Sequence, residues 1–425
     1  MSGESDLGGE QLLLPGKLGD PTRVLKTDRR ADPRMVAAMA ELGFDVAPEP
    51  MPVTAESPIE EIREFIAMME PGYQDAFEMW FAGLPPIENV ERRTEVITGL
   101  DGNDIKLYIH SPRNASGSLS CVYHVHGGGM VIMSAADTPY VRWRDELAAM
   151  GMVVVGVEFR NGAGKLGNHP FPAGLNDCMS GLQWTFDNKT ELGISRIVVS
   201  GESGGGNLSL AMSLKAKKDD KLAQIDGTYA LCPYISNAWA HKIPELPSLY
   251  ENDDYFLSCS AMGMMAVAYD PDHENDQNPL CWPYHANREE LEGPPPHVIS
   301  VNELDPLRDE GLAYFRMLSA AGVPVYSRTV NGTAHGADVI FRGRSLMCSQ
   351  LPFATSRVSR TRSDQIAATH VVRWQALKWL GPTCFSSGVS WAQMASARGH
   401  LLRKTHPEGG LMALGISPLR TVRFC

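Results

Sequence analysis

The pentapeptide Gly201-Glu202-Ser203-Gly204-Gly205 has the Gly-x-Ser-x-Gly spacing of a turn that presents a serine between a strand and a helix. The β-branched run Ile197–Ser200 precedes it, and a helical pattern rich in alanine and leucine follows it. A Cβ at either outer glycine would collide with the adjoining strand or helix, and the turn forces the serine into a strained backbone conformation. The pattern predicts that the Ser203 hydroxyl is presented as a nucleophile.

Three further segments with polar or glycine residues come directly after predicted strands. His126–Gly129 follows Cys121–Val125, Glu303–Asp309 follows His297–Val301, and Thr333–Gly336 follows Val325–Val330. A serine nucleophile needs an imidazole to take its proton, a carboxylate to orient that imidazole, and backbone amides to bind the developing oxyanion. These segments supply all of those groups, in the chain order serine, acid, histidine. The chemistry that they predict is acyl transfer.

Several carboxylates compete for the role of the acid. Glu202 lies in the turn itself and is better placed to anchor nearby backbone, and Asp309 is better placed to cap the helix that follows it. Glu303 precedes Asp305 by two residues, so both side chains can face the same way. Asp305 and Glu303 therefore stand as alternative acids.

From residue 93 onward the sequence predicts a hairpin and then an alternation of strands and helices. Two segments joined by a turn indicate an antiparallel hairpin, Arg93–Thr98 and Asp104–Ser111. The strands expected after it are Ser120–Val125, Met152–Phe159, Ile197–Ser200, Tyr229–Cys232, His297–Val301 and Val325–Val330. The helices expected between them are Pro139–Met150, Ala173–Leu192, the segment after Ser203, and Asp309–Ala321. This alternation predicts an α/β fold with a mostly parallel central sheet flanked by helices, with its active site at the carboxyl ends of the strands.

The two ends of the chain differ from its middle. Residues 1–30 are expected to be a flexible polar leader, and helical patterns follow at Pro33–Leu42 and Pro58–Glu70. Tyr73–Leu84 is a further apolar stretch. Residues 343–425 carry nine Arg and two Lys against one Asp and one Glu, in a chain whose total net charge is −12. This break predicts a domain boundary near residue 342 and a basic C-terminal tail, in which residues 364–380 could form a helix.

The composition excludes several classes of function. A net charge of −12 argues against a nucleic-acid partner, which needs a concentrated basic surface. The eight cysteines include no Cys-x-x-Cys pair, the N-terminus has no basic signal-peptide region, and no apolar run is long enough to span a membrane. We therefore expect a cytoplasmic protein with free thiols and no membrane span.

Two weaker patterns are set aside. His124 and His126 share one face of a strand, but the sequence suggests no third ligand, so no metal site is expected. Gly162–Gly167 matches a dinucleotide-binding pattern, but that pattern must open a helix, and Pro170 follows too soon for one.

Together, His126–Gly129, Gly201–Gly205, Asp305–Asp309 and His335-Gly336 resemble the motifs of the hormone-sensitive-lipase-like branch of the α/β-hydrolases, the bacterial family IV carboxylesterases. Asn168–Ala173 is similar to a stretch that precedes a long helix in that family. The resemblance runs from about residue 32 to residue 341. It implies an α/β-hydrolase domain at residues 31–342, with a helical cap built from about residues 31–90 and 236–290.

The resemblance also implies a role for each site residue and a function. The implied catalytic residues are Ser203 as nucleophile, Asp305 as acid and His335 as base, and the implied oxyanion-hole amides are those of Gly127, Gly128 and Gly204. The implied function is a serine carboxylic ester hydrolase that forms an acyl-enzyme with short- to medium-chain or small aryl or alkyl esters. No cofactor is implied, the partner is a small-molecule ester, and we also consider a homodimer.

The chain departs from the family pattern at three places. Gly204 replaces the usual alanine, the glycine-rich loop Phe159–Gly167 replaces a Tyr-Arg-Leu-Ala-Pro-Glu segment, and the basic tail replaces a closing C-terminal helix. Residues 364–380 could serve as that helix, or the tail could be an aberrant extension. The alternative functions are a non-catalytic small-molecule binder resembling plant gibberellin receptors, which lack the histidine, or an amidase, lactonase or acyltransferase with the same triad.

Five aromatic residues in the two cap ranges could line an acyl pocket or belong to the core. They are Phe77, Trp80, Phe81, Trp239 and Tyr255. The methionine cluster Met262–Met265 offers the same two interpretations.

Overall fold

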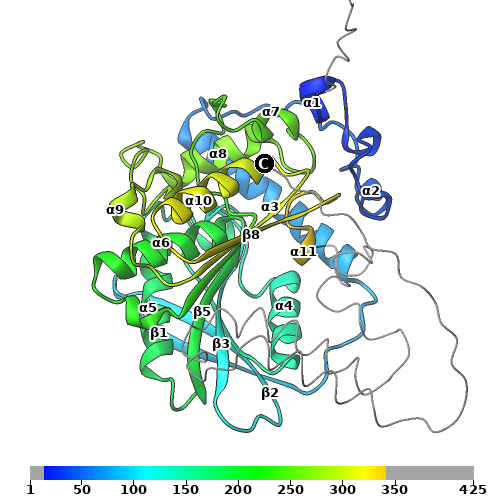
Figure 1. The fold of residues 1–425 in the computed structure, drawn as a ribbon. Coiled ribbons are helices and arrows are strands. Elements are labelled where there is room, and N and C mark those ends of the chain that lie inside the picture. Colours follow the sequence, from blue (N-terminus) through cyan, green and yellow to red (C-terminus); the bar gives the residue numbers. More distant parts are fainter. Residues whose placement is uncertain (1–13, 341–425) are drawn as a thin grey trace, which may run out of the picture. The chain divides into compact units, whose positions relative to one another are not determined.

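One mixed sheet organises residues 14–340, the part of the chain that the computed structural model describes. The strand order is β1-β2-β4-β3-β5-β6-β7-β8 (Figure 1). β1 pairs antiparallel with β2 and β2 pairs antiparallel with β4, whereas all later neighbours are parallel. The strands are β1 (Val90–Thr98), β2 (Asp104–Pro112), β3 (Leu119–Val125), β4 (Val153–Val157), β5 (Ile194–Glu202), β6 (Gly227–Leu231), β7 (His297–Asn302) and β8 (Val325–Val330). The predicted hairpin and mostly parallel sheet are confirmed.

Helices cover both faces of the sheet. One face carries α5 (Ala173–Asp187), α6 (Gly204–Lys218) and α10 (Arg308–Ala320), and the other carries α4 (Thr138–Ala149) (Figure 1). All five residues of β4 are buried, because a central strand between two helical layers exposes neither face to water. The four helices predicted between the strands are confirmed, although α5 ends at Asp187 and not at Leu192.

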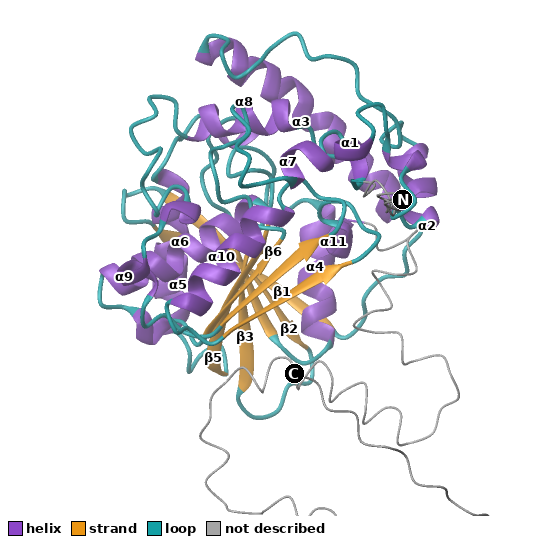
Figure 2. Ribbon diagram, turned by 45° about the horizontal axis from the view of Figure 1, so that its top comes forward, coloured by secondary structure: helices purple, strands orange, loops and turns teal. Residues whose placement is uncertain are grey.

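The remaining elements are short or lie above the carboxyl ends of the strands (Figure 2). They are α1 (Gly16–Gly19), η1 (Leu25–Thr27), α2 (Pro33–Ala40), α3 (Ile59–Phe81), η2 (Gly164–Leu166), η3 (Leu222–Gln224), α7 (Ser248–Glu251), α8 (Cys259–Tyr269), η4 (Pro283–His285), α9 (Arg288–Leu291) and α11 (Ala337–Ile340). We call α3 and α8 the cap helices, because they pack against each other over the site described below.

A single long helix, α3, continues past the end of the helix predicted at Pro58–Glu70 and includes most of the apolar stretch Tyr73–Leu84. Pro71 lies inside it, where proline removes a backbone donor and crowds the preceding turn. The apolar face of the helix nevertheless continues past this residue. Its buried members on both sides include Ile62, Ile66, Phe77 and Trp80. Tertiary packing of this face therefore overrides the local proline signal, which is why the sequence alone suggested a break.

The expectation of a flexible leader over residues 1–30 is wrong for residues 14–30. Leu25 is only 1% exposed and belongs to the main hydrophobic core. Arg30 forms ion pairs with Asp28 and with Glu251, which lies in α7. These contacts fasten the segment to the domain. Residues 1–13, the basic tail at 343–425 and the helix predicted at 364–380 lie outside the described residues.

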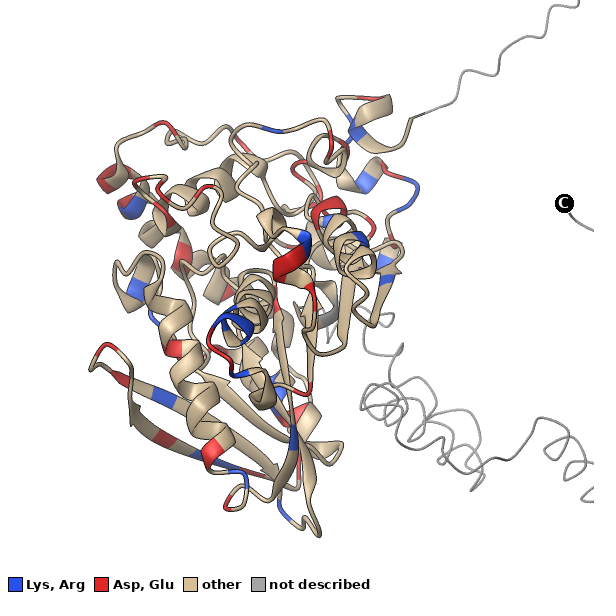
Figure 3. Cartoon of the chain, turned by 60° about the vertical axis from the view of Figure 1, so that its left-hand side comes forward, with Lys and Arg blue, Asp and Glu red and all other residues tan. Residues whose placement is uncertain are grey.

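Charged residues of both signs are interspersed over the described chain (Figure 3). At the centre of one buried group, the Glu251 carboxylate is contacted by both Arg30 and Arg308. Arg308 begins α10, directly after the loop that carries Asp305. The group thus connects the N-terminal segment to that loop.

Among residues 14–340, no helix is both long and apolar enough to cross a membrane.

Replacing Glu251 by Gln should lower the free energy of unfolding by about 3 kcal/mol, because it leaves two largely buried guanidinium groups without their shared carboxylate. The matched control is Glu292→Gln, which breaks the exposed Arg288–Glu292 pair and should cost less than about 1 kcal/mol. Urea unfolding of the three proteins measures both effects. Equal stability of the two variants would contradict the role given to Glu251.

Candidate active site

Ser203 is the single residue between the end of β5 and the start of α6, and its backbone conformation is strained. Its φ is 56° and its ψ is −118°, a region that non-glycine residues rarely occupy. The strain is held by hydrogen bonds on both sides of the residue: its amide donates to Leu231 O at 2.9 Å, and its carbonyl accepts from the amides of Asn207 and Tyr234. Ser203 therefore has the backbone geometry predicted for a presented nucleophile.

Close packing explains the glycines of the turn. A Cβ on Gly205 would lie 2.0 Å from Val125 O, and a Cβ on Gly201 would lie 2.3 Å from Gly205 O. No side chain fits at these distances, so the turn and strand β3 approach each other backbone to backbone. Gly204 is equally confined, since its Cβ would lie 2.4 Å from Met130 N. The family's usual alanine at this position would therefore displace the neighbouring loop in this chain.

His335 and Asp305 form a buried pair at the carboxyl ends of β8 and β7. His335 Nδ1 and Asp305 Oδ2 are 2.9 Å apart, and Asp305 is 0% exposed. Leu307 N donates to the other carboxylate oxygen at 2.9 Å, which fixes the orientation of the acid. The rival acid Glu303 instead accepts from Gly332 N at 2.7 Å. The structure thus pairs His335 with Asp305 and not with Glu303.

Two neighbours set the protonation of His335. Burial alone would lower the pKa of the imidazole, but Cys232 and the Asp305 carboxylate raise it well above the usual histidine value. Burial in turn raises the pKa of the Cys232 thiol, an effect opposed by its interaction with His335. Cys232 was missed by the sequence analysis. The signal that could have found it is its position directly after β6, beside the strands that carry the other site residues.

The loop after β3 supplies a different set of amides from the one predicted. Gly127 N donates to Glu202 Oε1 at 2.9 Å, so this amide is already occupied and the prediction for Gly127 is wrong. The next two residues, Gly128 and Gly129, have φ values of 99° and 62°. Within residues 14–340, the amides of Gly128, Gly129 and Gly204 have no hydrogen-bond acceptor. These three amides are therefore free to donate to an oxyanion.

Two buried glutamates hold this loop. Glu202 binds Gly127 N through one carboxylate oxygen and contacts His124 Nε2 through the other, at 3.1 Å. Glu70, on cap helix α3, accepts from Met133 N and Lys165 N, both at 2.7 Å. Glu70 thus ties the cap to the oxyanion loop and to the glycine-rich loop that distinguishes this chain. Because it lies on a helix far from the motifs in sequence, no sequence signal indicated its role.

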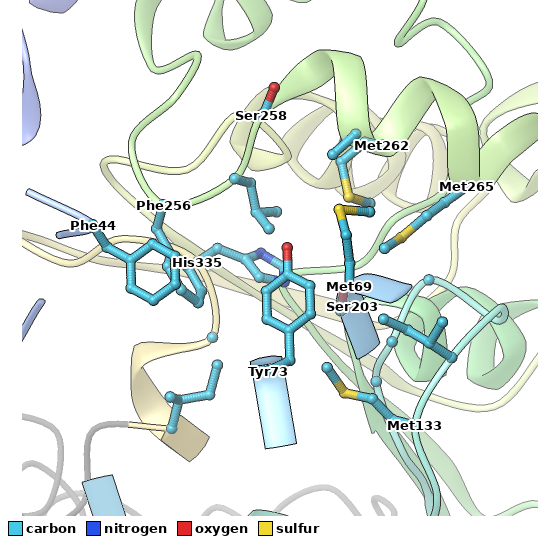
Figure 4. A pocket seen from close by; sticks show the side chains of 18 of the residues that line it. Phe44, Met69, Tyr73, Met133, Ser203, Phe256, Ser258, Met262, Met265 and His335 are labelled. Atoms are coloured by element: carbon cyan, nitrogen blue, oxygen red, sulfur yellow. The ribbon is translucent and has the colours of Figure 1, made fainter. Parts of the chain in front are cut away.

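A cavity of about 190 Å³ opens in front of Ser203 and His335, which both line it. Thioether and aromatic side chains surround the serine (Figure 4). The main apolar residues of the lining are Phe44, Met51, Met69, Tyr73, Phe77, Met133, Phe256, Leu257, Met262 and Met265. Met69, Tyr73 and Phe77 come from α3, and Met262 and Met265 from α8, so the cap helices form much of the wall.

Of the five aromatic residues that were predicted as possible pocket residues, only Phe77 lines the cavity. The other four are buried in the hydrophobic core and do not line the cavity: Trp80, Phe81, Trp239 and Tyr255. Large aromatic side chains stabilise a core as readily as they line a pocket, so residue type could not separate the two locations. Tyr255 illustrates this, since its hydroxyl donates to Asp28 Oδ2 at 3.1 Å.

Comparisons with known proteins agree with this geometry. Residues 122–338 match the α/β-hydrolase fold family. The structure is similar to that of brefeldin A esterase, a bacterial homologue of human hormone-sensitive lipase, with a TM-score of 0.78 and 40% identity over 86% of this chain and 99% of that chain. It is also similar to esterase Est22, with a TM-score of 0.69 and 32% identity over 85% of this chain and all of that chain.

Sequence relatives have the same kind of activity in their names. Carboxylesterase NlhH of Mycobacterium tuberculosis is 31% identical over 60% of this chain and 76% of its own length. An arylesterase of Saccharolobus solfataricus is 31% identical over 59% of this chain and 78% of its own length. The chain therefore belongs to the α/β-hydrolase fold family and, within it, to the esterases related to hormone-sensitive lipase.

Proposed function

We propose that this esterase hydrolyses small carboxylic esters through an acyl-enzyme on Ser203, with His335 as base and Asp305 as the acid that orients it. The observation that carries the proposal is that the strained serine and His335, which is hydrogen-bonded to Asp305, line one apolar cavity. The catalytic histidine also argues against a pure binding protein, because the 2.9 Å hydrogen bond to Asp305 prepares it to accept a proton.

The reaction follows from the groups around the cavity. Ser203 Oγ attacks the ester carbonyl carbon as His335 takes the hydroxyl proton, and Asp305 stabilises the imidazolium that forms. The amides of Gly128, Gly129 and Gly204 donate hydrogen bonds to the negatively charged tetrahedral oxygen. His335 then donates its proton to the leaving alcohol. Water repeats the sequence on the acyl-enzyme and releases the acid.

The size and lining of the cavity favour a small acyl group. Its volume of about 190 Å³ is below the roughly 300–1,000 Å³ of sites for drug-sized ligands. The methionine side chains of its wall are unbranched and flexible, so they can adapt to acyl groups of different shapes. Short-chain and compact esters therefore fit this site better than long-chain lipids.

Ser203→Ala should reduce hydrolysis of p-nitrophenyl acetate to background, and Asp305→Asn should reduce kcat about ten-thousand-fold, because His335 loses its tautomer control. Glu303→Gln is the matched control for the acid and should retain most of the activity, since its carboxylate contacts Gly332 N and not His335. Steady-state kinetics of the three variants tests the assignment. A severe loss in Glu303→Gln with activity kept in Asp305→Asn would reverse it.

The raised pKa of His335 should appear in the pH profile of kcat/KM. His335 must be neutral to accept the serine proton, so activity is lost as the pH falls through the pKa of this residue. We expect the acid limb to have its midpoint above the ordinary histidine value of about 6.5, because Cys232 and the Asp305 carboxylate together raise the pKa of the ring more than burial lowers it. Asp305→Asn should move this midpoint downward. A wild-type midpoint below the ordinary value would contradict the interaction.

From the size of the cavity we expect the enzyme to prefer esters with short acyl chains. Wild-type kcat/KM for p-nitrophenyl butyrate should exceed that for p-nitrophenyl palmitate by at least about tenfold, because the long chain cannot be enclosed. A series of p-nitrophenyl esters in one detergent-containing buffer measures this. Equal or rising kcat/KM toward the palmitate would show that the cavity does not limit the acyl group.

A further inference from the structure

Cys232 is a buried thiol beside the catalytic pair that the proposed reaction does not use. Cys232, Asp305 and His335 each offer one metal-ligating atom, and these atoms all lie within 4.8 Å of one another. All three residues are at most 5% exposed. A thiol, a carboxylate and an imidazole are the three kinds of ligand that zinc takes from proteins.

The sheet itself builds this group of three. Cys232 follows β6, Asp305 lies in the loop after β7, and His335 lies in the loop after β8, and these strands are neighbours in the sheet. Cys232 N donates to Ser300 O of β7 at 2.6 Å, which fastens it to the next strand. Its φ of 34° directs the chain out of β6 at that point. The three side chains are therefore held together by the same backbone that positions the triad.

The spacing is close to that of a tetrahedral site. Metal–ligand bonds of about 2.0–2.3 Å place the ligand atoms roughly 3.3–3.8 Å apart. The His335–Asp305 contact of 2.9 Å would open slightly, and the other separations, which are at most 4.8 Å, would close by no more than about 1.5 Å. Side-chain rotations can supply such shifts. The sulfur makes the set suited to a thiophilic ion and unsuited to magnesium, which requires hard oxygen ligands.

We propose that Cys232, Asp305 and His335 form an inhibitory site for a thiophilic divalent ion such as Zn²⁺ or Cd²⁺. On binding, Cys232 releases its thiol proton to solvent and its sulfur bonds to the ion, and Asp305 supplies a carboxylate oxygen. The proton of His335 Nδ1 moves to Nε2, so that Nδ1 supplies its lone pair to the ion. No group is oxidised or reduced. The ion holds the base and its acid in place of their mutual hydrogen bond, so His335 can no longer serve Ser203. The inhibitory effect, though not the site, rests on the proposed function.

The experiment titrates the full chain with Cd²⁺ in chelator-free buffer. Two readouts are followed: the ultraviolet charge-transfer absorbance of a cadmium–thiolate bond, and hydrolysis of p-nitrophenyl acetate relative to each protein's own rate with EDTA. The wild type should lose activity in parallel with the absorbance of one site and recover with EDTA. Mg²⁺ at the same concentrations should not inhibit.

Variants connect the effect to this group of three. Cys232→Ser should raise the half-inhibitory concentration of Cd²⁺ more than about tenfold and remove one equivalent of absorbance, because the sulfur ligand is lost. Cys259→Ser is the matched control, since Cys259 is also buried but its thiol donates to Leu249 O and lies in α8, away from His335 and Asp305. It should behave as the wild type. Cys232→Ala provides a second replacement if the serine variant does not fold.

His335→Ala separates a three-ligand site from binding to the thiol alone. It should raise the cadmium concentration needed for half-maximal absorbance more than about tenfold, a readout that requires no activity. Equal inhibition of Cys232→Ser and the wild type, or unchanged cadmium absorbance in His335→Ala, would overturn the proposal. If the wild type instead shows no esterase activity, the proposed function fails, and the absorbance of these variants still decides whether the site exists.

Discussion

The close approach of the serine turn to strand β3 is the constraint on which the site depends. Gly205 and Val125 O leave no room for a side chain, so the backbone must bend sharply and place Ser203 at a φ of 56°. Such a conformation persists only where its surroundings over-determine it. Hydrogen bonds to Leu231 and from Tyr234 supply that support. The hydroxyl consequently projects from the sheet edge toward the cavity, and every other functional group is arranged around that point.

The parallel sheet then brings the partners to the same edge. The base and its acid follow neighbouring strands, and the oxyanion loop follows β3, so the spacing of the strands sets the spacing of the groups. The cap is connected to this arrangement through buried charge. Glu70 reaches down from α3 to the oxyanion loop, and Glu251 joins the N-terminal segment to the loop of Asp305 through Arg308. The wall of the cavity and the site residues at the sheet edge are thus joined by direct contacts.

The sequence predicted the sheet, its hairpin and the pairing of His335 with a strand-end acid, because local motifs and apolar periodicity encode these features. It did not predict which amides are free, since that depends on Glu202 occupying Gly127 N. It could not decide whether Trp80 lines the pocket or belongs to the core, because an aromatic residue gives the same sequence signal in either place. It ended the helix at Glu70, before Pro71, because the tertiary packing that continues the helix cannot be recognised from local sequence. It overlooked Cys232, whose importance comes from the strands on either side.

The central claim is that the folded turn, and not serine chemistry in general, makes Ser203 reactive. Labelling with a fluorophosphonate, followed by peptide mass spectrometry, tests this most directly. The account predicts stoichiometric modification of Ser203 in the native protein and no modification of that residue after unfolding in urea. Labelling of another serine in the native protein, or equal labelling of Ser203 in the unfolded chain, would contradict it.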